Sequence, residues 1–196
     1  MLDPKKTNDL LNQFLMVARE DRASKPYSQD EAFVPKIAFI GPDDEAIVAA
    51  ITWRDEAEKY EKMRYAAEAA KITFSQAIML VSDTRWLRSD DFNEHFKIEG
   101  PTKPLNEKHM MEYQDRYYAV LRQYGGQIKN LPRHLWSEAV IVAIKGPRCG
   151  THTVMAPYTQ GPGDKVQYLP PDKSPLAKKD TDTWEEQLNL IPAWWQ

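Results

Sequence analysis

The carboxylate with the clearest chemical setting in this sequence is Asp83. It closely follows an apolar run at 76–81, whose lack of alternation is typical of a strand buried on both faces. Ligands of open α/β sheets collect where strands end, so an aspartate at that position can face a cleft. Together with its neighbours it gives a candidate cleft of Asp83, Arg85 and Trp86. The alternative is that Asp83 is a turn residue at the end of a strand.

Sulfur and imidazole groups give little support for a metal centre or a nucleophile. Cys149 is the single cysteine, which excludes an intramolecular disulfide and a cysteine-built zinc site and favours a reducing compartment. It lies three residues before His152 in a predicted turn, where the two can form a thiolate and its base; the alternative is an inert thiol. The histidines, which are His95, His109, His134 and His152, show none of the short metal-binding spacings. The sequence therefore predicts no metal and no cofactor.

An acidic turn at residues 43–45 follows the first predicted strand. Metal-dependent nucleases often pair such an acid with an acid-x-Lys triplet on the next strand. That strand, Ala46 to Trp53, contains no carboxylate and no lysine. We therefore interpret Asp43 and its neighbours as turn formers and expect no metal-dependent nuclease.

Charge is unevenly distributed along the chain. The formal net charge of the 196 residues is −3, yet residues 116–163, the basic-aromatic segment, carry six lysine and arginine side chains against the single carboxylate of Glu138. Cations with aromatic rings among them suit a nucleic acid as well as a protein. We expect a protein partner, because the whole chain is acidic and no nucleic-acid recognition module is visible. The predicted partner-binding residues here are Arg116, Arg122, Lys129, Arg133 and Trp136.

The pattern of apolar and turn residues predicts an α+β domain over residues 1–169, with a compact mixed sheet of four to six strands and two or three packed helices. Asp3 and Pro4 supply a capping side chain and a first-turn proline for the first helix. Strand, helix and strand then follow one another, and the two strands of such a crossover run parallel when they share a sheet. Residues 82–105 are expected to be irregular. The predicted elements are a helix at 4–21, a hairpin at 34–53, a helix at 55–71, a strand at 76–81, a helix at 107–124, a hairpin at 139–157 and an edge strand at 165–169.

Residues 170–196 form a proline- and tryptophan-rich tail. Its prolines favour an extended segment without a core of its own, and Thr183 has the capping-box spacing that begins a short helix. Three exposed indoles would be costly, so a surface of this domain or of another chain should receive them. The tail therefore adds Trp184, Trp194 and Trp195 to the predicted partner-binding residues.

Four short stretches together resemble a known group. They are the hairpin at 34–53, Trp53 to Glu56 leading into a helix, Ser82 to Trp86 after the next strand, and Ser137 to Val142 opening the late hairpin. Over residues 34–158 the chain resembles small α/β proteins of unknown function from tailed-phage and prophage genomes. It departs from them at residues 89–131, which add a helix, and in the tail. The resemblance implies a phage origin and no particular activity.

The leading hypothesis is a non-enzymatic binding or assembly protein that engages a protein partner, or a second copy of itself, through its tail and its basic-aromatic segment. The alternative is a small hydrolase or nucleic-acid-acting enzyme with Asp83 and a histidine in a cleft. No apolar stretch has the length of about 18 residues that a membrane span needs, so we expect no membrane contact. The predicted location is the cytoplasm, of the host cell if a phage encodes the protein, with the virion as the second expectation.

Overall fold

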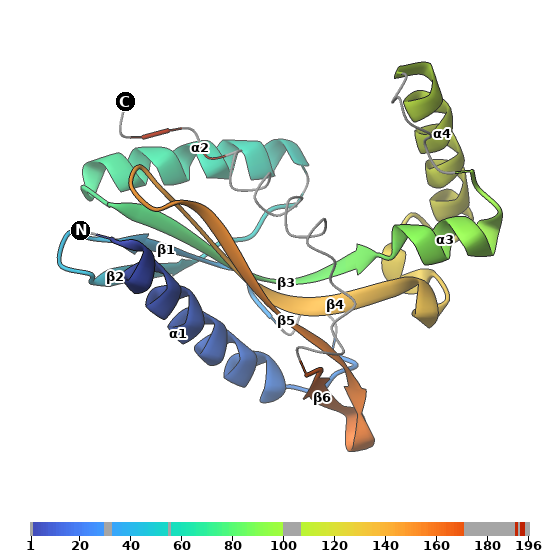
Figure 1. Ribbon diagram of the computed structural model, residues 1–196, viewed down its shortest axis with the longest axis horizontal. Helices are drawn as coiled ribbons and strands as arrows, with labels where there is room; N and C mark the ends of the chain where they lie inside the picture. Colours follow the sequence, from blue (N-terminus) through green and yellow to red (C-terminus); the bar gives the residue numbers. More distant parts are fainter. Residues whose placement is uncertain are drawn as a thin grey trace. The chain divides into compact units, whose positions relative to one another are not determined.

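The computed structural model describes residues 2–29, 33–54, 56–99, 107–170, 191, 193 and 194 (Figure 1). The chain divides into two compact units: a sheet unit of Met1–Thr84 with Ala139–Gln196, and a helical unit of Arg85–Glu138. The sequence predicts a single domain over 1–169 instead. No linker composition marks the observed boundary, because it falls inside two continuous strands.

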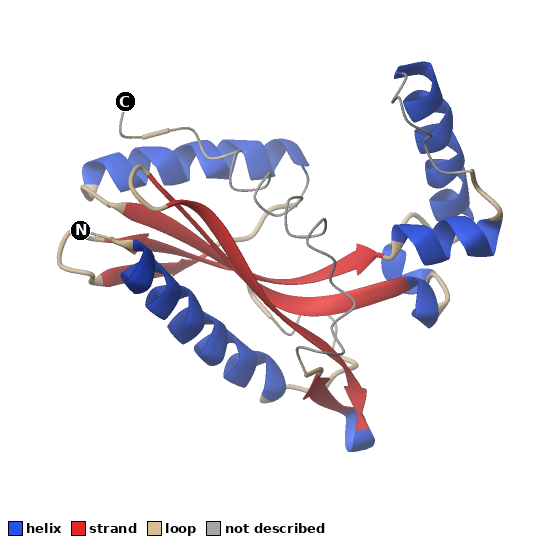
Figure 2. Ribbon diagram, viewed as in Figure 1, coloured by secondary structure: helices blue, strands red, loops and turns tan. Residues whose placement is uncertain are grey.

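The sheet contains six strands in the order β2-β1-β3-β4-β5-β6, with neighbouring strands antiparallel (Figure 2). Because β1 pairs antiparallel with both β2 and β3, the latter two run parallel to each other across it, as the predicted crossover requires. The strands are β1 (Lys36–Ile40), β2 (Ala46–Ala50), β3 (Ala77–Leu87), β4 (Trp136–Gly146), β5 (Gly150–Gly161) and β6 (Lys165–Tyr168). The helices are α1 (Pro4–Ala23), α2 (Glu56–Ile72), α3 (Ser89–Phe96) and α4 (Glu107–Gln123), with short 3-10 turns η1 (Ile128–Asn130), η2 (Arg133–Leu135) and η3 (Pro162–Asp164). The predicted α+β class is confirmed.

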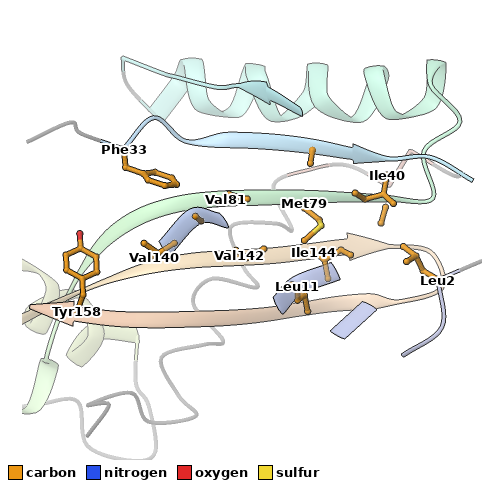
Figure 3. Close-up of a cluster of buried hydrophobic side chains, with 13 residues drawn as sticks. Leu2, Leu11, Phe33, Ile40, Met79, Val81, Val140, Val142, Ile144 and Tyr158 are labelled. Atoms are coloured by element: carbon orange, nitrogen blue, oxygen red, sulfur yellow. The ribbon is translucent and has the colours of Figure 1, made fainter. Parts of the chain in front are cut away.

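Helix α1 covers one face of the sheet. Its first turn is capped by the side chain of Asp3, which accepts from the amide of Lys6 at 2.8 Å, and Pro4 follows the cap as predicted. The buried stripe of α1 packs on side chains that point to the same side of β1, β3 and β4 (Figure 3). This cluster includes Leu11, Ala18, Ala38, Ile40, Met79, Val81, Val140, Val142, Ile144 and Tyr158.

Helix α2 covers the opposite face (Figure 1). Alternate residues of β1 and β3 point to this side and pack against the small residues of the helix. Residues 77–81 are therefore buried on both faces of the sheet, which explains why this part of the sequence is an unbroken apolar run. The cluster contains Ile37, Phe39, Ile51, Met63, Ala66, Ala67, Ala70, Ile78, Leu80 and Ala143, together with Ile191 and Trp194 from the tail.

Helix α2 ends in a Schellman motif that has a phenylalanine where glycine is usual. The amide of Ser75 donates to the carbonyl of Ala70 at 2.8 Å, and Phe74 adopts a φ of 51° with 82% of its surface exposed. A left-handed conformation strains a residue with a Cβ, and this side chain has little packing to lose. We expect Phe74→Gly to raise the free energy of unfolding by about 0.5 to 1 kcal/mol, measured by urea denaturation. A variant less stable than the wild type would contradict this expectation.

The helical unit has its own core, formed by α3, α4, η1 and η2. Where the sequence predicts an irregular segment at 82–105, β3 continues to Leu87 and α3 begins at Ser89. Helix α3 has no side-chain cap and spans eight residues, so it lacks the start signal and the length on which a periodic pattern depends. The core residues of this unit are Phe92, Ile98, Leu121, Leu131, Leu135 and Trp136.

Candidate functional site

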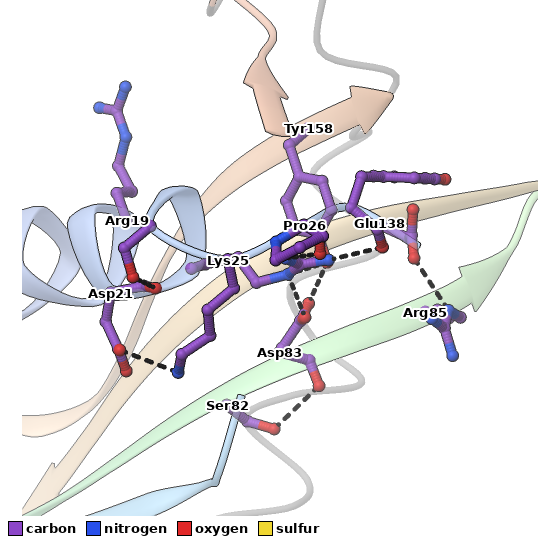
Figure 4. Close-up of polar contacts among 12 residues, drawn as sticks. Arg19, Asp21, Lys25, Pro26, Ser82, Asp83, Arg85, Glu138 and Tyr158 are labelled. Carbon is purple, nitrogen blue, oxygen red and sulfur yellow. Dashed lines mark hydrogen bonds and ion pairs between the residues drawn. The ribbon is translucent and has the colours of Figure 1, made fainter. Parts of the chain in front are cut away.

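Asp83 lies inside β3, and two side chains of the sheet unit hold its carboxylate (Figure 4). Nε of Arg22 lies 3.0 Å from Oδ2, and the hydroxyl of Tyr158 donates to Oδ1 at 2.6 Å. Arg22 comes from the last turn of α1 and Tyr158 from β5. Three elements far apart in the sequence therefore meet at this carboxylate, and both of its oxygens accept a hydrogen bond.

The guanidinium of Arg22 is buried, with 2% of the side chain exposed. Besides Asp83 it contacts two backbone carbonyls, those of Pro26 at 3.2 Å and of Tyr27 at 3.1 Å. Burial by itself lowers the pKa of Arg22, but the contacts with Tyr158 and Asp83 outweigh it and the pKa is raised. A buried charge of this kind depends on its partner, so the Asp83 carboxylate anchors the end of α1 to the sheet.

The other two residues of the predicted cleft belong to the helical unit. Nε of Arg85 lies 2.8 Å from Oε1 of Glu138, a carboxylate of which 2% is exposed, and Trp86 is half-buried on β3. Asp83 and Arg85 thus each have an ionic partner of their own, in different units. The sequence does not reveal Arg22 as a partner of Asp83, although Arg22 continues the buried stripe of α1 at a spacing of four from Ala18.

Two of the predicted partner-binding residues, Arg133 and Trp136, pack against each other. The guanidinium carbon of Arg133 lies 4.2 Å from the centroid of the Trp136 ring, and its NH2 group reaches Glu138 at 3.5 Å. The indole itself is 6% exposed and donates from Nε1 to the carbonyl of Leu131 at 3.1 Å. In contrast to the prediction of a surface contact, Trp136 is a core residue of this unit, because its neighbours enclose the ring.

Helix α4 carries two more of these residues on different sides. Arg122 is exposed, and its Nε donates to the carbonyl of Tyr118 at 3.2 Å. Tyr118 is itself 55% exposed, and Met111, seven residues before it, is 61% exposed. Arg116 is exposed as well, but six residues separate it from Arg122, which places the two about 120° apart around the helix. The outward face of α4 therefore carries Met111, Asp115, Tyr118 and Arg122, which follow one another at spacings of four, three and four.

Lys129 is exposed in η1, outside this face. In the tail, Trp194 is 7% exposed and donates from Nε1 to the carbonyl of Ser75 at 3.0 Å. Next to it, Nζ of Lys145 donates to the carbonyl of Ile191 at 2.8 Å, and burial lowers the pKa of Lys145. Trp194 is therefore received by its own sheet unit. Trp184 and Trp195 lie outside the described residues.

The sequence offers Cys149 as a nucleophile with His152 as its base. Burial raises the pKa of the Cys149 thiol, which disfavours the thiolate, and His152 is exposed on β5. His95 and His134 meet edge to face within the helical unit, with their ring centroids 5.1 Å apart. The side chain of His109 is outside the described part. Across the described residues, no group of three or more histidine, cysteine, aspartate and glutamate side chains is placed to hold a metal ion.

The acidic turn between β1 and β2 carries Asp44 at a φ of 64°. Nζ of Lys6 donates to its carboxylate at 2.7 Å, and this hydrogen bond lowers the pKa of Asp44. Nε2 of Gln76 donates to the other oxygen at 3.0 Å. These contacts fix the turn, as its composition indicates.

Family models, curated proteins and solved structures were compared with this chain, and none matches it. Among the described residues, no helix has the length and apolar character to cross a membrane.

Proposed function

We propose that this chain is a non-enzymatic binding or assembly protein, encoded by a phage, that meets a protein partner through the outward face of α4. The support for a phage origin is the resemblance over residues 34–158. The observation that carries the binding role is the exposure of Met111 and Tyr118 beside a cation, Arg122, on a helix whose opposite side builds the core of the helical unit.

This face has the composition of a protein interface. Tyrosine, methionine and arginine are enriched at such surfaces, where an aromatic or thioether group is buried and a guanidinium pairs with a carboxylate. Arg122 favours a partner segment that carries a carboxylate beside an apolar side chain. The tail enters the proposal with Trp184 and Trp195, since Trp194 is already packed within the sheet unit.

We expect Tyr118→Ala combined with Arg122→Glu to weaken partner binding about tenfold or more, because both an interface aromatic and an interface charge are lost. A photo-crosslinking amino acid at Met111 identifies the partner in cells that express the chain. Binding of the purified partner is then titrated at several salt concentrations, and the affinity of the wild type should fall as salt rises.

Arg116→Glu is the matched control, since it makes the same charge change on another side of the same helix. We expect it to retain binding within about threefold, as for a charge at an interface rim. Equal losses in both variants would indicate unspecific attraction to a basic helix. Unchanged binding in the Tyr118 and Arg122 double variant would refute this face as the contact surface.

A further inference from the structure

Strand β2 is one end of the six-stranded sheet. In the part of the chain that the structure describes, its one sheet neighbour is β1 (Figure 1), and all five residues of β2 are exposed. Ile47 is 59% exposed and Val48 is 50% exposed, and the rest of the strand is alanine. Natural edge strands usually carry lysine, proline, an inward charge or a bulge that prevents pairing with another chain. None of these residue types occurs within β2.

The opposite end of the same sheet shows what a protected edge looks like. Strand β6 has four residues, begins with Lys165, and packs Val166 and Tyr168 against the core cluster that α1 covers. A short strand with a charge is a poor template for pairing. Strand β2 carries no charge, and this difference distinguishes the two ends of one sheet.

The hydrogen bonds to β1 show which groups of β2 face outward. The amide of Gly41 donates to the carbonyl of Glu45, and the amide of Ile51 donates to the carbonyl of Pro35, both at 2.8 Å. In an antiparallel ladder the bonded residues alternate, so the odd-numbered residues of β2 bond β1 and the even-numbered ones turn their N–H and C=O groups to the outer edge. The outward residues are Ala46, Val48 and Ala50.

We propose that a second copy of this chain pairs with β2 in antiparallel fashion, about a twofold axis at Val48, and joins the two sheets into one. In this register Val48 faces its own counterpart and Ala46 faces Ala50, so every outward residue donates one hydrogen bond and accepts one. On the other face Ile47 of each copy meets Ala49 of the second copy, a large side chain against a small one. An isologous contact of this kind closes with two chains.

The charges beside the strand fit the same register. It aligns Asp43 of one copy with Trp53 of the other, one residue from Arg54, whose side chain is 88% exposed and whose Nε also pairs with Glu58 at 3.0 Å. An acid of one copy therefore lies near a cation of the other at both ends of the paired strands, and no like charges meet within β2. A parallel pairing would instead bring the two acidic turns together. This complementarity favours a second copy over an unrelated strand.

The inference does not rest on the function proposed above, because β2 belongs to the sheet unit and α4 to the helical unit. We expect the full chain to sediment at twice its 22.7 kDa mass at high concentration and to dissociate on dilution. Amide hydrogen exchange at Ala46, Val48 and Ala50 should slow as concentration rises. Exchange at Ile47 and Ala49 should change least, because those amides already bond β1.

Val48→Lys tests the axis, since it sets two like charges opposite each other at an exposed position that the fold does not need. We expect its dissociation constant to rise tenfold or more, and an equimolar mixture with Val48→Glu to restore association. Gln167→Lys on β6 is the matched control and should dimerise like the wild type. The Tyr118 and Arg122 double variant should also dimerise, so failure of this inference is distinguishable from failure of the proposed function.

Three results would overturn the inference. The first is a chain that stays monomeric while the three outward amides exchange rapidly at every concentration. The second is a monomer in which those amides are protected at every concentration, because a segment of the same chain then covers the edge. The third is a dimer that Val48→Lys leaves intact, since its contact must then lie elsewhere.

Discussion

Replacement of Asp83 by alanine is expected to lower the free energy of unfolding by about 3 to 5 kcal/mol, because it leaves the buried guanidinium of Arg22 without its ionic partner. The guanidinium of Arg22 is 2% exposed and cannot lose its proton at any ordinary pH. Without Asp83 it keeps the carbonyls of Pro26 and Tyr27, which neutralise no charge. Urea denaturation followed by circular dichroism measures the change.

Asp21→Ala is the matched control. Asp21 also forms ion pairs, with Lys25 at 2.9 Å and Lys36 at 2.6 Å, but 29% of its side chain is exposed. Such pairs contribute about 0 to 1 kcal/mol, so this variant should unfold close to the wild type. The double variant Arg22→Met with Asp83→Leu should regain most of the lost stability, since it removes both charges.

A small effect of Asp83→Ala, within about 1 kcal/mol, would contradict the anchoring role. The same series separates this role from the alternative of an enzyme with Asp83 in a cleft. A catalytic carboxylate can be replaced with loss of activity and little loss of stability, whereas the anchor predicts the reverse.

Local signals predict most of the elements. The capped start of α1, the turn between β1 and β2 and the apolar run in β3 are all encoded by residues close together in the sequence. The end of β3 is not. Asp83 and Arg85 read as the polar start of a loop, yet they continue the strand because Arg22, 61 residues before Asp83, and Glu138, 53 residues after Arg85, neutralise them. The residues next to such a charge in the sequence do not reveal its distant ionic partner.

The candidate surface residues show the same limit. A run of cations and rings predicts a contact region, but it does not say which rings turn inward. Trp136 is enclosed by the helical unit, whereas Tyr118 is exposed. Helical spacing separates Tyr117, which packs on Phe92 at 5.3 Å between centroids, from its neighbour Tyr118. Helical spacing in the sequence thus predicts part of the exposed face of α4, but nothing in the sequence predicts that Trp136 is buried.

The second large effect is expected at Trp194. The sequence predicts that the domain stays folded when residues 180–196 are deleted, since the tail is expected to bind a partner. Trp194 and Ile191 instead complete the cluster under α2, where they are 7% and 0% exposed. We expect Trp194→Ala to lower the free energy of unfolding by about 3 to 5 kcal/mol, because the indole leaves a cavity and the carbonyl of Ser75 loses its donor.

Deletion of residues 180–196 should cost more than Trp194→Ala, because it also removes Ile191 and leaves Nζ of Lys145 without that carbonyl. Tyr60→Ala is the matched control, because Tyr60 is 55% exposed on α2. Loss of this aromatic ring should change the free energy of unfolding by less than about 0.5 kcal/mol. If Trp194→Ala unfolds at the same urea concentration as Tyr60→Ala, the tail is not part of the core. In that case Trp194 is available to bind a partner, which is the role that the sequence predicts for the tail.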